Sequence, residues 1–297
     1  MNRRKFLRTA TAATITGSLL PQTILSAESK GVHWPIGCFN RPWHEKTDWG
    51  FDTALDGIKA AGYKIVGLLR TGDNEPLTGA NATEDYLKKL KGRIVARGLS
   101  VNMTALRTAN NLPVDAQIKN MRGQIDHAAF IGAEFGLTFG VDKPDQFENY
   151  YKVMQDAAPY AKEKGLQVVL KPHGGASGAA EEISRCIAKV NHPNFKVWFD
   201  AGNIIYYTGK DPVEQLRPIV QYVTGFCAKD CDKKGGSVAL EFGKGAVDFH
   251  AVFAEMKKAG FNGPIMVECV AKSETAAEAT ANARKNLEYL ENVFKTL

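Results

Sequence analysis

The chain has 297 residues, of which 44% are hydrophobic and 24% are charged, as in ordinary globular proteins. Its formal net charge of +6 falls to +2 without Arg3, Arg4, Lys5 and Arg8, because 34 basic residues then face 32 acidic ones. This balance excludes the strongly basic surface of a nucleic-acid-binding protein. The five cysteines are scattered and odd in number, so no disulfide framework is expected.

The N-terminal segment resembles a twin-arginine export signal. Arg3-Arg4 is followed by Phe6-Leu7 and then by a mildly apolar stretch over residues 10–20, which is too short to span a bilayer. The pattern predicts a signal peptide over residues 1–27, a mature chain over 28–297, and a periplasmic or secreted location. No other segment approaches transmembrane length, so no membrane span is expected.

Short apolar runs alternate with helix-patterned segments along the mature chain. Strands are expected over residues 34–39, 64–69, 99–106, 134–139, 167–170, 196–199, 223–228 and 264–267. Helices are expected over residues 51–61, 83–96, 115–130, 145–164, 179–190, 212–221, 249–259 and 275–293. This alternation predicts right-handed βαβ units and a parallel sheet. Because no Gly-x-Gly-x-x-Gly follows the first strand, we expect an α/β fold that is a single (β/α)8 TIM barrel, and not an open dinucleotide-binding sheet.

Ionisable residues follow the predicted strands, at the end where (β/α)8 barrels place their chemistry. The fifth strand runs into Lys171-Pro172-His173, and the sixth runs into Asp200-Ala201-Gly202-Asn203. The other strand ends supply Arg70, Arg107, Lys229, Asp230 and Glu268. An acid directly after a buried Ile-Met-Val run is costly without a role, so Glu268 is expected to be functional.

With these motifs the chain resembles the xylose isomerase-like barrels, the sugar phosphate isomerase/epimerase superfamily that also contains endonuclease IV. The motifs that carry the resemblance are Lys171-Pro-His173, Phe199-Asp200-Ala-Gly-Asn203, Ala228-Lys229-Asp230, the segment from Gly243 to Phe249, and Val267-Glu268. The resemblance implies one divalent ion, often Mn²⁺ or Mg²⁺. Its ligands would be a Glu after the fifth strand, an Asp after the sixth, a His on the seventh and a Glu after the eighth.

Two of the four implied ligand positions differ in this chain. Asp200 and Glu268 are kept, whereas Lys171 stands where the first Glu is expected and Cys227 stands where the His is expected. An ammonium group at Lys171 would repel a metal ion at that place. His173 is an alternative ligand that would form a set with Asp200 and Glu268. The sequence leaves open whether a divalent ion, Mn²⁺ or Mg²⁺, is bound.

The resemblance implies an enzyme that removes a proton beside the carbonyl of a sugar or keto-sugar, giving isomerisation or epimerisation. The N-terminal segment adds the expectation that this enzyme is exported. Glu268 and Lys171 are expected to be the catalytic acid/base pair. The expected substrate-binding residues are His173, Asn203, Lys229, Asp230, Arg70 and Arg107. A small-molecule sugar is the expected partner, and the oligomeric state is left open.

Three other interpretations were weighed. A lyase that cleaves an oxidised (keto) glycoside by elimination suits an exported protein. A non-catalytic carbohydrate-binding barrel is the second alternative. Endonuclease IV-like DNA repair needs a zinc cluster of many histidines, which the six scattered histidines of this chain do not supply.

Overall fold

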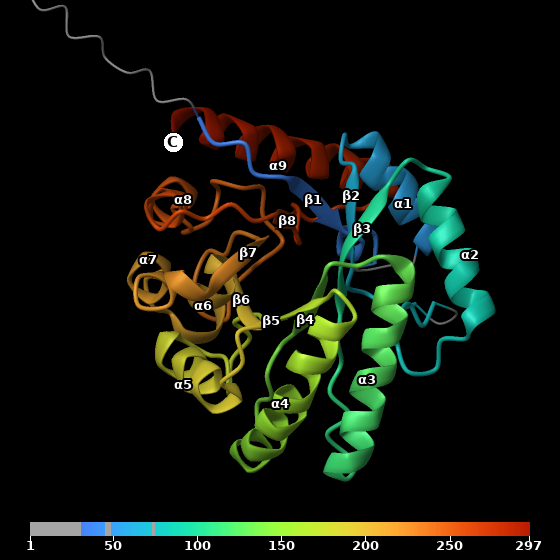
Figure 1. Cartoon of the computed structure of the whole chain (residues 1–297). Helices are drawn as coiled ribbons and strands as arrows, with labels where there is room; N and C mark the ends of the chain where they lie inside the picture. The colour runs from blue at the N-terminus through green and yellow to red at the C-terminus, as the bar shows by residue number, and fades with distance from the viewer. Residues whose placement is uncertain (1–30, 45–48, 73–74) are drawn as a thin grey trace, which may run out of the picture.

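The computed structural model describes residues 31–44, 49–72 and 75–297, and the predicted signal peptide lies outside these ranges. Eight parallel strands close into a barrel in chain order, with the last strand paired to the first (Figure 1). The (β/α)8 barrel predicted from the sequence is confirmed. The strands are β1 Ile36–Phe39, β2 Ile65–Leu68, β3 Ser100–Ala105, β4 Phe135–Thr138, β5 Gln167–Leu170, β6 Phe195–Phe199, β7 Val223–Ala228 and β8 Ile265–Val267.

Helices surround the barrel, and Figure 1 shows the third and fourth of them side by side on one flank. The α-helices are α1 Phe51–Ala60, α2 Glu84–Val95, α3 Val114–Ile131, α4 Phe147–Glu163, α5 Ala180–Val190, α6 Ala201–Thr208, α7 Pro212–Leu216, α8 Phe249–Lys258 and α9 Ala276–Thr296. Three short 3₁₀ helices accompany them: η1 Arg41–Trp43, η2 Pro144–Gln146 and η3 Val220–Tyr222.

Polar caps and glycines set several of the helix ends. The hydroxyl of Thr83 accepts the backbone N–H of Tyr86 at 3.2 Å and begins α2. The carboxylate of Asp248 accepts the N–H of Ala251 at 2.9 Å and begins α8. Gly132 adopts a left-handed conformation with φ of 89° and ends α3. Polar caps and left-handed glycines of this kind are the common local signals of helix ends.

Two helices differ from the prediction, both between β6 and β7. The segment directly after β6 was interpreted as a loop, but it forms α6, because the side chain of Asp200 caps the helix by accepting the N–H of Asn203 at 2.8 Å. The helix predicted over residues 212–221 ends at Leu216. Pro218 explains this end, since proline has no N–H and disfavours helical geometry at the residue before it.

An apolar layer fills the interior of the barrel. It takes one buried side chain from or next to each strand: Phe39, Leu69, Met103, Leu137, Val169, Trp198, Cys227 and Met266. Gly225 makes room for the largest of them, because a Cβ there would lie 2.2 Å from the indole nitrogen of Trp198. The barrel is therefore a packed core, and ligands have access only at its ends.

All five cysteines are buried free thiols. Among the helices of the described ranges, none is both long enough and apolar enough to cross a membrane.

Candidate active site

A pocket of about 440 Å³ opens at the carboxyl ends of the strands. Four of the side chains that line it carry a positive charge and one carries a negative charge: Arg41, Arg70, Arg107 and Lys229 against Glu268. A second hollow of about 430 Å³ adjoins it and shares Arg107 with it. Because arginine and lysine only donate hydrogen bonds, the pocket suits a ligand rich in oxygen acceptors.

Two lysines and two carboxylates form a buried cluster at the floor of this pocket. Lys171, Asp200, Lys229 and Glu268 follow the neighbouring strands β5, β6, β7 and β8, and each is at most 2% exposed. The Nζ of Lys171 contacts Oε2 of Glu268 and lies 3.1 Å from Oδ2 of Asp200. The Nζ of Lys229 lies 2.7 Å from Oε1 of Glu268 and 3.4 Å from Oδ2 of Asp200. Each ammonium group therefore bridges both carboxylates.

The four members of this cluster are not equally accessible to a ligand. Lys229 and Glu268 line the pocket, whereas Lys171 is not among the lining residues and is only 1% exposed. Lys171 was predicted to act directly on substrate with Glu268. The structure instead places it in contact with Glu268 beneath the pocket surface, where its ammonium lies against both carboxylates.

The buried charges determine each other's ionisation. Burial alone would raise the pKa of Glu268, but Lys171, Lys229 and Arg41 outweigh it and hold that pKa well below its usual range. Burial also opposes the charge of Lys229, yet Asp200 and Glu268 raise its pKa above the ordinary value. Both side chains are therefore charged near neutral pH. Removing one partner of such a buried pair typically costs about 3–5 kcal/mol, because a buried charge is left uncompensated.

Arg41 completes the ring of cations around Glu268, and the sequence pattern did not single it out. It follows β1 directly, at the start of η1, and its Nη1 donates to Oε1 of Glu268 at 2.7 Å. The neighbouring Asn40 fixes this end of the barrel, since its Oδ1 accepts the backbone N–H groups of Leu69 at 2.9 Å and Arg70 at 3.0 Å. Since β1 pairs with β8, a basic residue directly after β1 is expected to lie near Glu268, which directly follows β8. This is the sequence signal that could have identified Arg41.

His173 lies on the wall of the pocket, where its ring contacts two aromatic side chains. The hydroxyl of Tyr207 lies 3.0 Å from Nε2, and the ring of Phe139 meets the imidazole edge-on with centroids 5.3 Å apart. Burial, reinforced by the positive charges of Lys171 and Lys229, lowers the pKa of His173 to about 3. The imidazole is therefore neutral at physiological pH and can accept or donate one hydrogen bond. Burial also raises the pKa of Tyr207 to about 12, so its hydroxyl keeps its proton.

Three other predicted substrate-binding residues line the pocket as well. The backbone N–H of Asn203 donates the capping bond to Asp200, and its Nδ2 donates to the carbonyl of Pro172 at 2.6 Å. Arg107 donates to the carbonyl of Leu69 at 2.8 Å. Arg70 stands at the exposed rim. Contact of these side chains with substrate remains a prediction.

Asp230 was also predicted to bind substrate, but its carboxylate points into the glycine-rich loop that precedes α8. Its Oδ2 accepts the backbone N–H groups of Gly243 and Gly245, both at 2.9 Å. Its Oδ1 accepts those of Cys231 at 2.8 Å and Val247 at 3.2 Å. The side chain is fully buried and does not line the pocket. Asp230 therefore anchors the loop and has no oxygen directed at a ligand.

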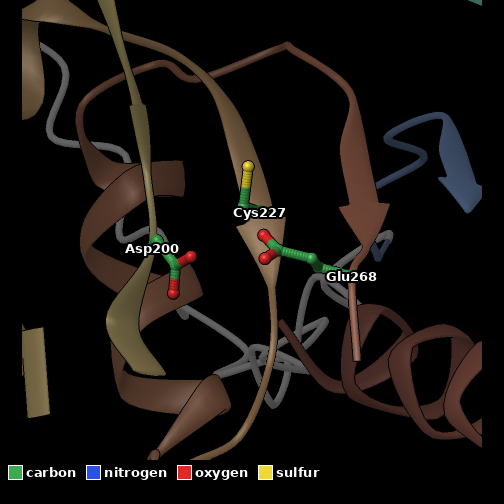
Figure 2. A group of neighbouring side chains, drawn as sticks. All are labelled: Asp200, Cys227 and Glu268. Atoms are coloured by element: carbon green, nitrogen blue, oxygen red, sulfur yellow. The ribbon is translucent and has the colours of Figure 1, made fainter. Parts of the chain in front are cut away.

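The divalent ion implied by the sequence resemblance is poorly matched by this site. In the described part of the chain, one group of potential ligands comes together, Asp200, Cys227 and Glu268, with donor atoms within 4.8 Å of one another; Figure 2 shows their side chains. The ammonium groups of Lys171 and Lys229 contact both of these carboxylates. Two unit charges about 4 Å apart interact by about 4 kcal/mol at an effective dielectric constant of about 20, and a divalent ion doubles this repulsion for each ammonium.

The remaining donors do not compensate for this repulsion. Burial in the apolar layer raises the pKa of the Cys227 thiol well above its usual value, so forming the thiolate that a metal ion binds is costly here. The predicted set of His173 with Asp200 and Glu268 is not formed, because the imidazole lies on the pocket wall beside Tyr207. As arranged here, these residues do not fit a divalent metal ion.

Comparison with known proteins places the chain in a family. The family model described as xylose isomerase-like TIM barrel matches residues 55–293. The chain belongs to this family. The L-ribulose-5-phosphate 3-epimerase UlaE of Escherichia coli (strain K12) is 29% identical over 247 residues, covering 78% of this chain and 85% of that enzyme. The UlaE enzyme of Salmonella paratyphi C is 32% identical over 96 residues, so the match spans about a third of that relative's length (32%).

Solved structures of xylose isomerase-like barrels share the fold. The D-allulose 3-epimerase from Methylomonas sp. in complex with D-allulose superimposes with a TM-score of 0.69 at 18% identity, covering 88% of this chain and 97% of that one. A xylose isomerase-like TIM barrel protein from Mycobacterium smegmatis in complex with magnesium gives a TM-score of 0.69 at 17% identity, over 89% and 97% of the two chains. At these identities the solved structures show the shared fold.

Proposed function

We propose that the chain is a sugar isomerase or epimerase that removes a proton from a carbon next to a carbonyl group. The observation that carries this proposal is the carboxylate of Glu268 at the pocket floor, with the ammonium of Lys229 2.7 Å away from it. A base and a cation side by side are what the reaction needs, since loss of the proton places negative charge on the carbonyl oxygen. The relatives named as 3-epimerases of L-ribulose 5-phosphate and of D-allulose support the same class.

Among the cations that line the pocket, Lys229 and Arg41 contact Glu268, and these two stabilise the developing charge. An ammonium group has three N–H donors. That of Lys229 donates one hydrogen bond to Oε1 of Glu268 and forms an ion pair with Asp200 at 3.4 Å, so it has donors left for a substrate oxygen. Charge stabilisation of this kind is effective because the groups are already oriented in a site with little water. Lys171 acts as a positioning residue that holds Glu268 and Asp200 from below.

Glu268 acts as the base, and binding of the substrate activates it. In the ligand-free arrangement Lys171, Lys229 and Arg41 lower its pKa, which makes the carboxylate a weak base. A substrate carbonyl oxygen that accepts hydrogen bonds from Lys229 and Arg41 draws these donors away from Glu268. The proton affinity of the carboxylate then rises, because fewer donors stabilise its charged form.

Elimination from a keto-glycoside is the second candidate, and the His173–Tyr207 pair favours it. The same base forms the same enolate, which then expels the oxygen substituent two carbons from the carbonyl. That leaving oxygen needs a proton, and the Tyr207 hydroxyl on the pocket wall is a donor held by neutral His173. In an epimerisation the pair would instead orient a sugar hydroxyl.

Proton exchange with solvent tests the proposal and separates the candidates. The purified protein is incubated in D₂O with D-allulose, L-ribulose and a 3-keto-glycoside in turn, and the products are followed by ¹H NMR. An epimerase replaces the proton beside the carbonyl with deuterium and yields the epimer. A lyase releases the free aglycone, and a non-catalytic binding barrel gives neither product.

The variant Glu268→Gln tests the base directly. It keeps the shape of the side chain and removes the base, so the exchange rate should fall by about 10²–10⁴-fold. Glu288→Gln, at an exposed position of α9, is the matched control and should keep the wild-type rate. Wild-type exchange in Glu268→Gln would contradict the assignment of the base.

We also infer that the protein is exported through a twin-arginine pathway, as Arg3-Arg4 and the apolar stretch after it indicate. These residues lie outside the described ranges, so the test is made in cells. The full chain should accumulate in the periplasm or medium of a host with this pathway. A chain with Arg3→Lys and Arg4→Lys should remain inside the cell, and equal export of the two would contradict the inference.

A further inference from the structure

We propose that this site binds no divalent metal ion, and that Lys171 and Lys229 together supply the positive charge that holds the carboxylates of Asp200 and Glu268 close to each other. The inference deepens the proposed function and rests on it for the reaction. It concerns metal binding, however, which is measured without substrate. A failure of either proposal can therefore be recognised independently of the other.

The first argument is the charge count of the cluster. Two carboxylates carry two negative charges, and the two ammonium groups carry two positive ones, the same charge as one divalent ion. The contacts are also equivalent, because each ammonium bridges Asp200 and Glu268 in the way that a shared metal ion would. A metal ion added to this arrangement would introduce charge that no carboxylate of the cluster is left to neutralise.

The second argument is the position of Lys171. It follows β5, is 1% exposed, and touches a carboxylate from β6 and another from β8, so its ammonium lies within the space that these carboxylates enclose. Lys229 approaches the same two side chains from β7, which lies between them in the barrel. The space between Asp200 and Glu268 is therefore already filled by two side chains of the protein.

The third argument comes from the groups around the cluster. Arg41 brings a further positive charge to within 2.7 Å of Glu268. Cys227, the third potential ligand, belongs to the apolar layer inside the barrel together with Trp198 and Met266. The surroundings thus add one more cation on the pocket side and an apolar wall on the other, and neither favours entry of a hydrated divalent ion.

Manganese titration of the full chain is the first test. Free Mn²⁺ is measured by its electron paramagnetic resonance signal, and thermal unfolding is followed with and without Mn²⁺ or Mg²⁺. We expect no one-to-one site with a Kd below about 1 mM, and no rise in Tm at that concentration. One Mn²⁺ or Mg²⁺ bound per chain at micromolar concentration, with a higher Tm, would overturn the proposal.

Lys171→Glu is the second test, because it replaces the ammonium with a third carboxylate beside Asp200 and Glu268. We expect this variant to bind Mn²⁺ at least about 100-fold more tightly than the wild type. Lys171→Gln removes the charge without adding a ligand, and Lys258→Glu makes the same charge change at an exposed position of α8; both should bind no better than the wild type.

The variants also show which residue keeps the metal out. If folded Lys171→Glu binds Mn²⁺ no more tightly than Lys258→Glu, the position assigned to Lys171 is wrong. If Lys171→Glu fails to fold without metal, refolding in Mn²⁺ but not in its absence would equally show that the substitution has created a metal site. The wild-type titration decides the proposal without any variant.

Discussion

Replacing Asp230 with asparagine should destabilise the fold strongly, although the change is nearly isosteric. The carboxylate accepts four backbone hydrogen bonds, from Gly243 and Gly245 on one oxygen and from Cys231 and Val247 on the other. Asp230→Asn keeps one oxygen and turns the other into an NH₂ group that faces two N–H donors. Hydrogen bonds to a charged group contribute about 1.5–3 kcal/mol each, so the loss of two lowers the free energy of unfolding by about 3–6 kcal/mol.

Urea and thermal unfolding followed by circular dichroism measure this effect. For a chain of this size, a loss of about 3–6 kcal/mol corresponds to a fall in Tm of roughly 6–24 °C. Asp248→Asn is the matched control, because this exposed carboxylate accepts a single bond from Ala251 and asparagine caps helices equally well. A change below about 0.5 kcal/mol in Asp230→Asn, combined with loss of sugar binding, would refute the structural role and restore the predicted contact with substrate.

Three further predictions concern stability and reactivity. The pKa of His173 is about 3 in the fold and 6.5 for the free side chain, so between these values the unfolded chain binds a proton that the folded chain does not. The free energy of unfolding therefore falls as the pH is lowered through this range. In urea unfolding, His173→Gln should flatten this dependence between about pH 7 and pH 5. Gly225→Ala should lower the free energy of unfolding by about 1–3 kcal/mol, because it forces a Cβ against Trp198. Gly92→Ala, in open space on α2, should raise it by about 0.5–1 kcal/mol. Equal effects of the two substitutions would contradict the packing argument. All five thiols are buried, so a thiol reagent should label none in the native protein and five in urea, and rapid native labelling would disprove their burial.

The strands and most helices could be predicted because their signals are local. Apolar runs ended by glycine or by polar residues define β1 to β8 to within about two residues. The prediction failed where a single residue begins or ends a helix. The capping side chain of Asp200 begins α6, and Pro218 ends α7 before the chain reaches η3. Both signals are present in the sequence, but no helix was predicted directly after Asp200, and Pro218 was included in the helix predicted over residues 212–221.

The sequence predicts which residues form the site better than it predicts how their side chains are arranged. Four residues that each follow a barrel strand lie together as expected: Lys171, Asp200, Lys229 and Glu268. Depth within the barrel depends on side-chain direction and packing, which spacing along the sequence does not encode. For this reason Lys171 was expected to face substrate, and the direction of Asp230 into its loop was not foreseen.

The ammonium of Lys171 differs from a bound ion in being covalently attached to the chain. A bound ion has an occupancy that varies with its concentration, and it can be lost on dilution or exchanged for a competing ion. The lysine side chain is present in every folded copy at full stoichiometry, wherever the protein is located. Assembly of the cluster is therefore completed by folding alone, and a chain that has folded correctly needs no later loading step.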